Sequence, residues 1–180
     1  MIQITRVPHV GVIKGCFFLN APLNYFISVF TTVVLVESHY FIRFNQSISL
    51  SEQYLLDCVP FVCNGGYFYD GLEFVTNNGI PLESNNNLNN KGKCPKHFQK
   101  APLNVTGYTL LETFDEEKVR RIVGTVGPVV VGIDGSLQTF IFYKSGIFTQ
   151  SNCTENKNHP ILIVGYGSEN GTDFWWIRNS

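Results

Sequence analysis

The sequence predicts an α+β domain in which a helical half precedes a β half. Up to about residue 79 apolar residues recur at helical spacing, whereas beyond Pro128 short apolar runs are interrupted by Gly and Asn, as strands often are. With 180 residues and 44% hydrophobic content, the chain is long enough to bury a core of its own. Helices that come first and strands that come last predict two subdomains with a cleft between them.

Three helices are predicted in the helical half. Residues 25–44 are apolar on nearly every side, which is typical of a helix buried at the centre of a domain, although their many β-branched residues suit a buried strand almost equally well. Residues 52–58 follow Ser51, a favourable N-cap, and form the second helix. The third helix runs from Phe68 to Gly79, which suits the left-handed closing position.

The β half is predicted to follow a solvated loop. Residues 83–92 are dominated by Asn and have no apolar face to bury. Asp115 and the acidic residues after it open a helix that ends at Gly127. The predicted strands are residues 129–133, 146–149, 161–166 and 174–178.

Composition and charge exclude several classes of function. The formal net charge is −1 and no Lys/Arg-rich block is present, so we expect no binding to nucleic acid. The apolar run at residues 17–36 is interrupted by polar residues, which argues against a membrane span. We expect neither a cofactor nor a metal. Five Cys and four Asn-x-Ser/Thr triplets, at Asn45, Asn104, Asn152 and Asn170, point to an oxidising, glycosylating compartment.

Two residues of the β half are candidates for catalysis. His159 precedes one predicted strand and Asn179 follows the next, and a turn at residues 169–171 would bring them together as a hairpin. A cysteine peptidase needs a thiolate, a His that takes and returns its proton, and a group that orients the His. A lone His more often has a structural role, so the neighbouring motifs decide its meaning.

These motifs resemble those of papain and the cathepsins, in the same order along the chain. They are SLSEQYLLDC at 49–58, CNGG at 63–66, VGPV at 126–129, HPILIVGYG at 159–167 and FWWIRNS at 174–180. The resemblance covers about residues 25–180 and implies a papain-like two-subdomain fold with residues 25–44 as its central helix. It also implies a cysteine-type peptidase whose active site lies at the N-terminus of that helix, with His159 and Asn179 as catalytic residues.

The nucleophile of that family is missing from this chain. The family's spacing to Glu37 places the catalytic Cys at Ile27, and the Gln that helps form the oxyanion hole falls at Ala21. Cys16 is the only thiol upstream, but its distance from Glu37 and its neighbours differ from the family pattern. We therefore predict that the chain as written does not hydrolyse peptides.

Two explanations of the missing nucleophile stay open. The residues before Ser28 are either a misread exon edge in an ordinary peptidase gene, which we favour, or part of a genuine pseudo-peptidase that binds extended peptides or cystatin-like inhibitors. We expect residues 1–24 to be irregular and residues 25–180 to be an incomplete papain-like domain. In that domain, residues of about 25–110 form the helical half and residues 111–180 the β half.

The resemblance also implies substrate contacts and a disulfide. Gly65 and Gly66 would present backbone to an extended peptide, and the pocket for the second substrate residue would be formed by Tyr67, Phe68, Gly132 and Pro160. Cys58 would pair with Cys94, which leaves open the pairing of Cys16, Cys63 and Cys153. The expected protein is a lysosomal or secreted monomer that takes peptide or protein substrates.

Overall fold

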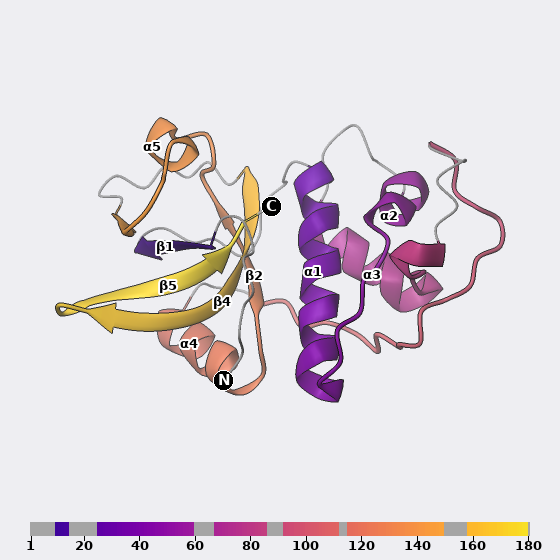
Figure 1. Ribbon diagram of the computed structural model, residues 1–180, viewed down its shortest axis with the longest axis horizontal. Coiled ribbons are helices and arrows are strands. Elements are labelled where there is room, and N and C mark those ends of the chain that lie inside the picture. Colours follow the sequence, from indigo (N-terminus) through magenta and orange to yellow (C-terminus); the bar gives the residue numbers. More distant parts are fainter. Residues whose placement is uncertain are drawn as a thin grey trace.

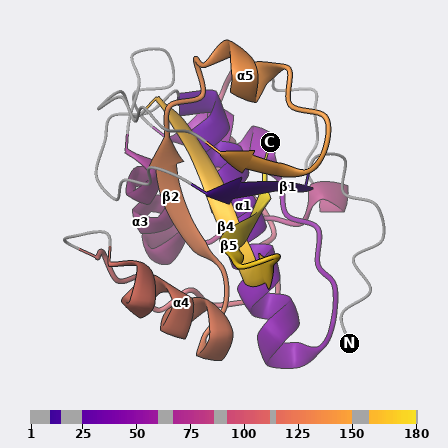
Figure 2. The same cartoon turned by 90° about the vertical axis from the view of Figure 1, so that its left-hand side faces the viewer.

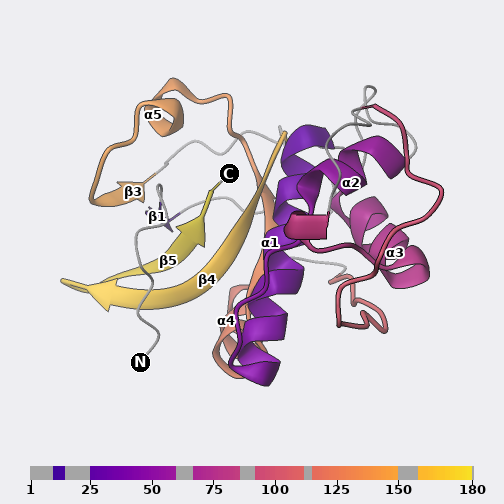
Figure 3. The same ribbon diagram turned by 45° about the vertical axis from the view of Figure 1, so that its right-hand side comes forward.

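The computed structural model describes residues 10–14, 25–59, 67–85, 92–111, 115–149 and 158–179. A helical half and a β half lie on opposite sides of helix α1 (Tyr25–Phe44), as Figures 1 and 3 show. Helices α2 (Glu52–Cys58) and α3 (Phe68–Asn78) lie on one side of α1 and the sheet on the other. The predicted α+β fold with two subdomains is confirmed.

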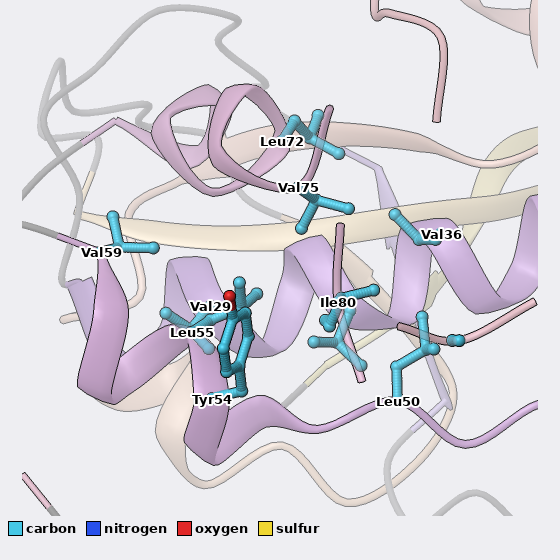
Figure 4. Close-up of a cluster of buried hydrophobic side chains, with 11 residues drawn as sticks. Val29, Val36, Leu50, Tyr54, Leu55, Val59, Leu72, Val75 and Ile80 are labelled. Carbon is cyan, nitrogen blue, oxygen red and sulfur yellow. The ribbon is translucent and has the colours of Figure 1, made fainter. Parts of the chain in front are cut away.

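Helix α1 is buried on two faces because it packs against both halves. One face, which includes Val29, Val33 and Val36, joins the core of the helical half (Figure 4). Another face places Val34 against Val130 and Leu162 of the sheet. This double burial explains why residues 25–44 are apolar nearly all round, and the alternative of a buried strand is wrong.

The helices of the first half begin and end as their sequences predict. The N–H of Tyr54 donates to Ser51 Oγ at 3.3 Å, and α3 ends before Gly79, whose φ is +79°. Cys58 and Cys94 form a disulfide, which ties the end of α2 to a distant loop. The predicted loop at 83–92 differs at its start, where Glu83–Asn85 form a short 3₁₀ helix, η1.

Within the described residues, the β half is a five-stranded sheet in the order β2 (Val129–Ile133), β4 (His159–Glu169), β5 (Thr172–Arg178), β1 (Val10–Lys14) and β3 (Ile147–Thr149). Helix α4 (Glu116–Thr125) inserts Val119 into the sheet core, and Asp115 Oδ1 accepts a hydrogen bond from the N–H of Lys118 at its N-terminus. Figures 1 and 2 show α4 and a short helix, α5 (Gln138–Ile141), at opposite ends of this half.

Strands β4 and β5 form a hairpin with a two-residue turn. Asn170 and Gly171, with φ of +51° and +76°, occupy the turn, and left-handed residues there suit the right-handed twist of the strands. Glu169 pairs with Thr172 across the turn. The predicted hairpin is therefore present, with strands longer than the apolar runs alone indicated.

Strand β1 corrects the expectation that residues 1–24 are irregular. Val10–Lys14 pair antiparallel with β5 and parallel with β3, so these five residues form an interior strand of the sheet. The strands with which they pair, β3 and β5, lie far away in the sequence. A segment of five residues carries no local pattern that would predict this pairing. None of the described helices combines the length and apolar character needed to cross a membrane.

Candidate active site

The predicted pair of His159 and Asn179 meets at one end of the hairpin. His159 is the first residue of β4, and Asn179 directly follows β5. Because the hairpin is antiparallel and pairs Leu162 with Arg178, the start of β4 and the end of β5 lie side by side. The Nε2 atom of His159 lies 2.6 Å from Oδ1 of Asn179, a hydrogen-bond distance.

Burial sets the chemistry of the His159 ring. Burial disfavours the imidazolium and lowers the pKa of His159 from its usual value, whereas the hydrogen bond to Asn179 acts in the opposite direction. The edge of the ring also faces Phe140 of α5, with ring centroids 5.8 Å apart and planes at 66°. The arrangement favours a neutral imidazole in a fixed orientation near pH 7.

The loop that contains Asp134 and Gly135 was not predicted from the sequence, and it packs against His159. A Cβ atom on Gly135 would lie 2.5 Å from Cβ of His159, so only a glycine allows this approach. The N–H of Gly135 donates to Asn158 Oδ1 at 2.9 Å, and Asn158 Nδ2 donates to Asp134 Oδ1 at 3.3 Å. The Asp-Gly-Ser triplet that starts at Asp134 is a turn signal that could have revealed this loop.

The first turns of α1 lie beside the His159–Asn179 pair. Arg178, the neighbour of Asn179, places its guanidinium 6.0 Å from the centroid of the Phe30 ring. Ile27 lies one turn before Phe30, in the first turn of α1, where the positive end of the helix dipole would favour a thiolate. The side chain of Ile27 and all of Ala21 lie outside the described part of the chain.

The expected substrate residues are placed in both halves. Gly132 and Pro160 are buried and pair directly across β2 and β4, next to the pair formed by Ile133 and His159. The register therefore continues through Pro160 without a break. Tyr67 precedes α3, is 40% exposed and stacks on Tyr69 with ring centroids 4.9 Å apart.

The remaining expected residues bear less on the site. Phe68 begins α3, and only its backbone is described. Gly65 and Gly66 lie outside the described residues, as do Cys16, Cys63 and Cys153. Within the described ranges, no three His, Cys, Asp or Glu side chains gather as a metal site would require.

An α+β fold whose β hairpin joins a His to an Asn beside the start of a central helix is the arrangement of a papain-type peptidase. The chain belongs to that family: the model of the papain family cysteine proteases matches residues 28–180. The match begins one residue after Ile27.

Named relatives agree with this assignment. Cathepsin S of Bos taurus is 32% identical over 98% of this chain and 52% of its own length. Digestive cysteine proteinase 2 of Homarus americanus is 34% identical over 84% of this chain and 49% of its own. The solved structure of digestive procathepsin L2 proteinase from Tenebrio molitor larval midgut matches with a TM-score of 0.78 and 32% identity, covering 90% of this chain and 55% of that one. The chain thus spans about half the length of these relatives.

Proposed function

We propose that this chain is a cysteine peptidase by descent that does not hydrolyse peptides in the form given by its sequence. One observation carries the proposal: the His159–Asn179 pair is intact at 2.6 Å, while the position of the nucleophile at the start of α1 holds Ile27. A His that has no thiol to deprotonate cannot begin covalent catalysis.

The size of the expected loss is large. Removing the nucleophile of a hydrolase triad lowers kcat by about 10⁶, which corresponds to about 8 kcal/mol of transition-state stabilisation. Ala21 at the oxyanion position would remove about 3 kcal/mol more, since its side chain has no hydrogen-bond donor. The aliphatic side chain of Ile27 can act neither as a nucleophile nor as a hydrogen-bond donor.

The test is an activity assay on the purified chain with a dipeptidyl-coumarin substrate. We expect no release of coumarin above the buffer rate, both for the native sequence and for the matched control His159→Ala. Hydrolysis by the native sequence that disappears in His159→Ala would overturn the proposal. Sequencing the transcript across codons 14–30 then separates a misread exon edge, which would read Cys in place of Ile27, from a genuine pseudo-peptidase.

The second candidate function is binding without cleavage. The chain keeps Tyr67, Gly132 and Pro160 at the positions where the family holds substrate, and the last two are paired beside His159. A pseudo-peptidase would use these residues to hold extended peptides, protein substrates or cystatin-like inhibitors. Calorimetry that detects no binding of a cystatin or of an extended peptide would rule this function out.

The compartment and assembly state follow from the same proposal. A lysosomal or secreted protein is supported by the Cys58–Cys94 disulfide, because disulfides persist where the surroundings are oxidising. A monomer is expected, and size-exclusion chromatography with light scattering tests it.

A further inference from the structure

A cavity of about 610 Å³ lies between the two halves, near the end of α1 that is far from Ile27. Its walls come from the second half of α1, from residues 104–111, which join the two halves, and from β2 with the turn before it. The volume is within the range of about 300–1,000 Å³ that is usual for small-molecule sites. Arg43 in the last turn of α1 is about 24 Å along the helix axis from Ile27, at 1.5 Å per residue.

The walls of this cavity are largely apolar. Leu35, Val36 and Val130 line it from the core side, and Val105, Leu111 and Ile122 line it from the connecting segment and α4. Some large apolar side chains on its rim remain exposed, among them Leu110 at 41% and Val126 at 57%. An apolar body entering the cavity would therefore remove this surface from water.

One wall is held by a contact between the halves. The ring Nε2 of His39 in α1 lies 3.2 Å from the backbone oxygen of Pro128, just before β2. A Cβ on Gly127 would lie 2.9 Å from Cε1 of His39, so the turn fits closely against this ring. His39 therefore contacts the backbone of this turn, and the two halves touch directly at this end of the cavity.

The described residues that line the cavity carry one formal positive charge and no negative charge. Among them, Arg43 is the only Lys, Arg, Asp or Glu. Within the described part of the chain, Arg43 has neither an ion pair nor a hydrogen bond through its side chain. An exposed guanidinium that no described side chain engages, at the edge of an apolar cavity, favours a ligand with an apolar body and an anionic end, since Arg binds carboxylates in a bidentate fashion.

We propose that this cavity binds an amphipathic monocarboxylate of the medium-chain fatty acid class. The alkyl chain lies against Leu35, Val105 and Ile122, and the carboxylate accepts hydrogen bonds from the Arg43 guanidinium. Arg43 also lies at the negative end of the α1 dipole, where the positive charge of a Lys would be equally favourable. The site is separate from the His159–Asn179 pair, and the proposal does not depend on peptidase activity.

Calorimetric titration of the full chain with laurate, below its micelle concentration, tests the proposal. We expect saturable binding of one laurate, weakened about tenfold in Arg43→Gln, because a charge-assisted hydrogen bond contributes on that scale. The neutral analogue 1-dodecanol should bind the native chain and Arg43→Gln equally. Thr106→Trp, which fills the cavity from an exposed position, should abolish the binding of both ligands.

Two further variants make the result specific. Arg43→Lys keeps the charge at the end of α1 but not the bidentate geometry, so its laurate affinity should fall between those of the native chain and Arg43→Gln. Arg120→Gln, on the exposed side of α4, should bind laurate as the native chain does. The proposal is overturned if laurate does not bind saturably, if Thr106→Trp binds it normally, or if Arg43→Gln weakens laurate and dodecanol to the same extent.

Discussion

His159 Nε2 lies 2.6 Å from Asn179 Oδ1, between residues that flank the two strands of one hairpin. An amide oxygen accepts hydrogen bonds only, so the proton of the neutral ring is on Nε2 and Nδ1 is left as the basic nitrogen. The contact therefore selects one tautomer and one ring orientation.

The titration of His159 should depend on Asn179. Burial lowers the pKa of His159 below the usual 6.5 and the hydrogen bond to Asn179 opposes this shift, so Asn179→Ala should lower the pKa further. Two-dimensional ¹H–¹⁵N NMR of the imidazole across pH 4–8 measures both values. Because the folded state binds this proton less readily than the unfolded state, His159 lowers the free energy of unfolding as the pH falls through 6.5. A higher pKa in Asn179→Ala would contradict this account.

Gly135→Ala should disturb His159. The new Cβ would lie 2.5 Å from Cβ and 2.7 Å from Cγ of His159, at the root of the side chain, where a rotamer change brings no relief. We expect the free energy of unfolding to fall by about 1–3 kcal/mol, as for other overpacked sites, and the NMR signals of the ring to shift. Gly165→Ala is the matched control, because its Cβ would meet Trp176 at 3.4 Å, an ordinary contact. Equal effects of the two substitutions would refute the argument.

Ile27→Cys should create a reactive thiol without restoring full hydrolysis. The first turn of α1 favours a thiolate, and the imidazolium that forms when His159 takes the thiol proton would lower the pKa of the thiol further. We expect iodoacetamide to label Cys at position 27 at pH 6 faster than the other cysteines, as followed by peptide mass spectrometry. Adding His159→Ala should slow this labelling. Unchanged labelling in the double variant would show that His159 does not reach position 27.

The partly buried carboxyl of Glu37 should make the free energy of unfolding depend on pH. Its Oε1 accepts a hydrogen bond from the buried N–H of Leu50 at 2.9 Å, and burial raises the pKa of Glu37, despite opposing effects of that bond and of Arg178. The protonated carboxyl thus favours the folded state below the unfolded-state value of 4.5, and this contribution is lost as the pH rises through the folded-state pKa.

Two variants at this position separate the charge from the hydrogen bond. Glu37→Gln should gain stability relative to the native chain between pH 4 and pH 7, since it carries no charge to desolvate. Glu37→Ala leaves the Leu50 N–H without an acceptor and should lower the free energy of unfolding by about 1–3 kcal/mol at both pH values. Urea unfolding measures each quantity, and a pH-independent difference between Glu37→Gln and the native chain would count against the role of burial.

The disulfide should stabilise the helical half. Cys58 and Cys94 are 36 residues apart, and closing a loop of that length restricts the unfolded chain by about 4 kcal/mol on the chain-entropy model. The double variant with Cys58→Ala and Cys94→Ala should unfold at a lower urea concentration. Reductant should lower the midpoint of the native chain but not that of the double variant, and equal sensitivity of both would show that another thiol is responsible.

Local pattern was sufficient for most helices and for the hairpin. Ser51 and Asp115 begin helices as expected, since an N-cap acts within three residues of its partner. His159 and Asn179 meet as predicted because the two-residue turn makes the strands antiparallel neighbours, although their register shifts by one residue between Ile163 and Gly165. Strand β1 and helix α5 were missed, because β1 pairs with residues far away in sequence and α5 is only four residues long.

The sequence by itself therefore determined the family, the order of helices and strands, the His159–Asn179 pair and the absence of a thiol at Ile27. Only the tertiary structure decided that Phe140 and Gly135 hold the ring of His159, that β1 lies inside the sheet and that Arg43 faces an apolar cavity. Periodicity, caps and turns act over a few residues and leave a mark in the sequence. Packing between segments far apart along the chain leaves no such mark, because it is selected by the shape and burial of the whole domain.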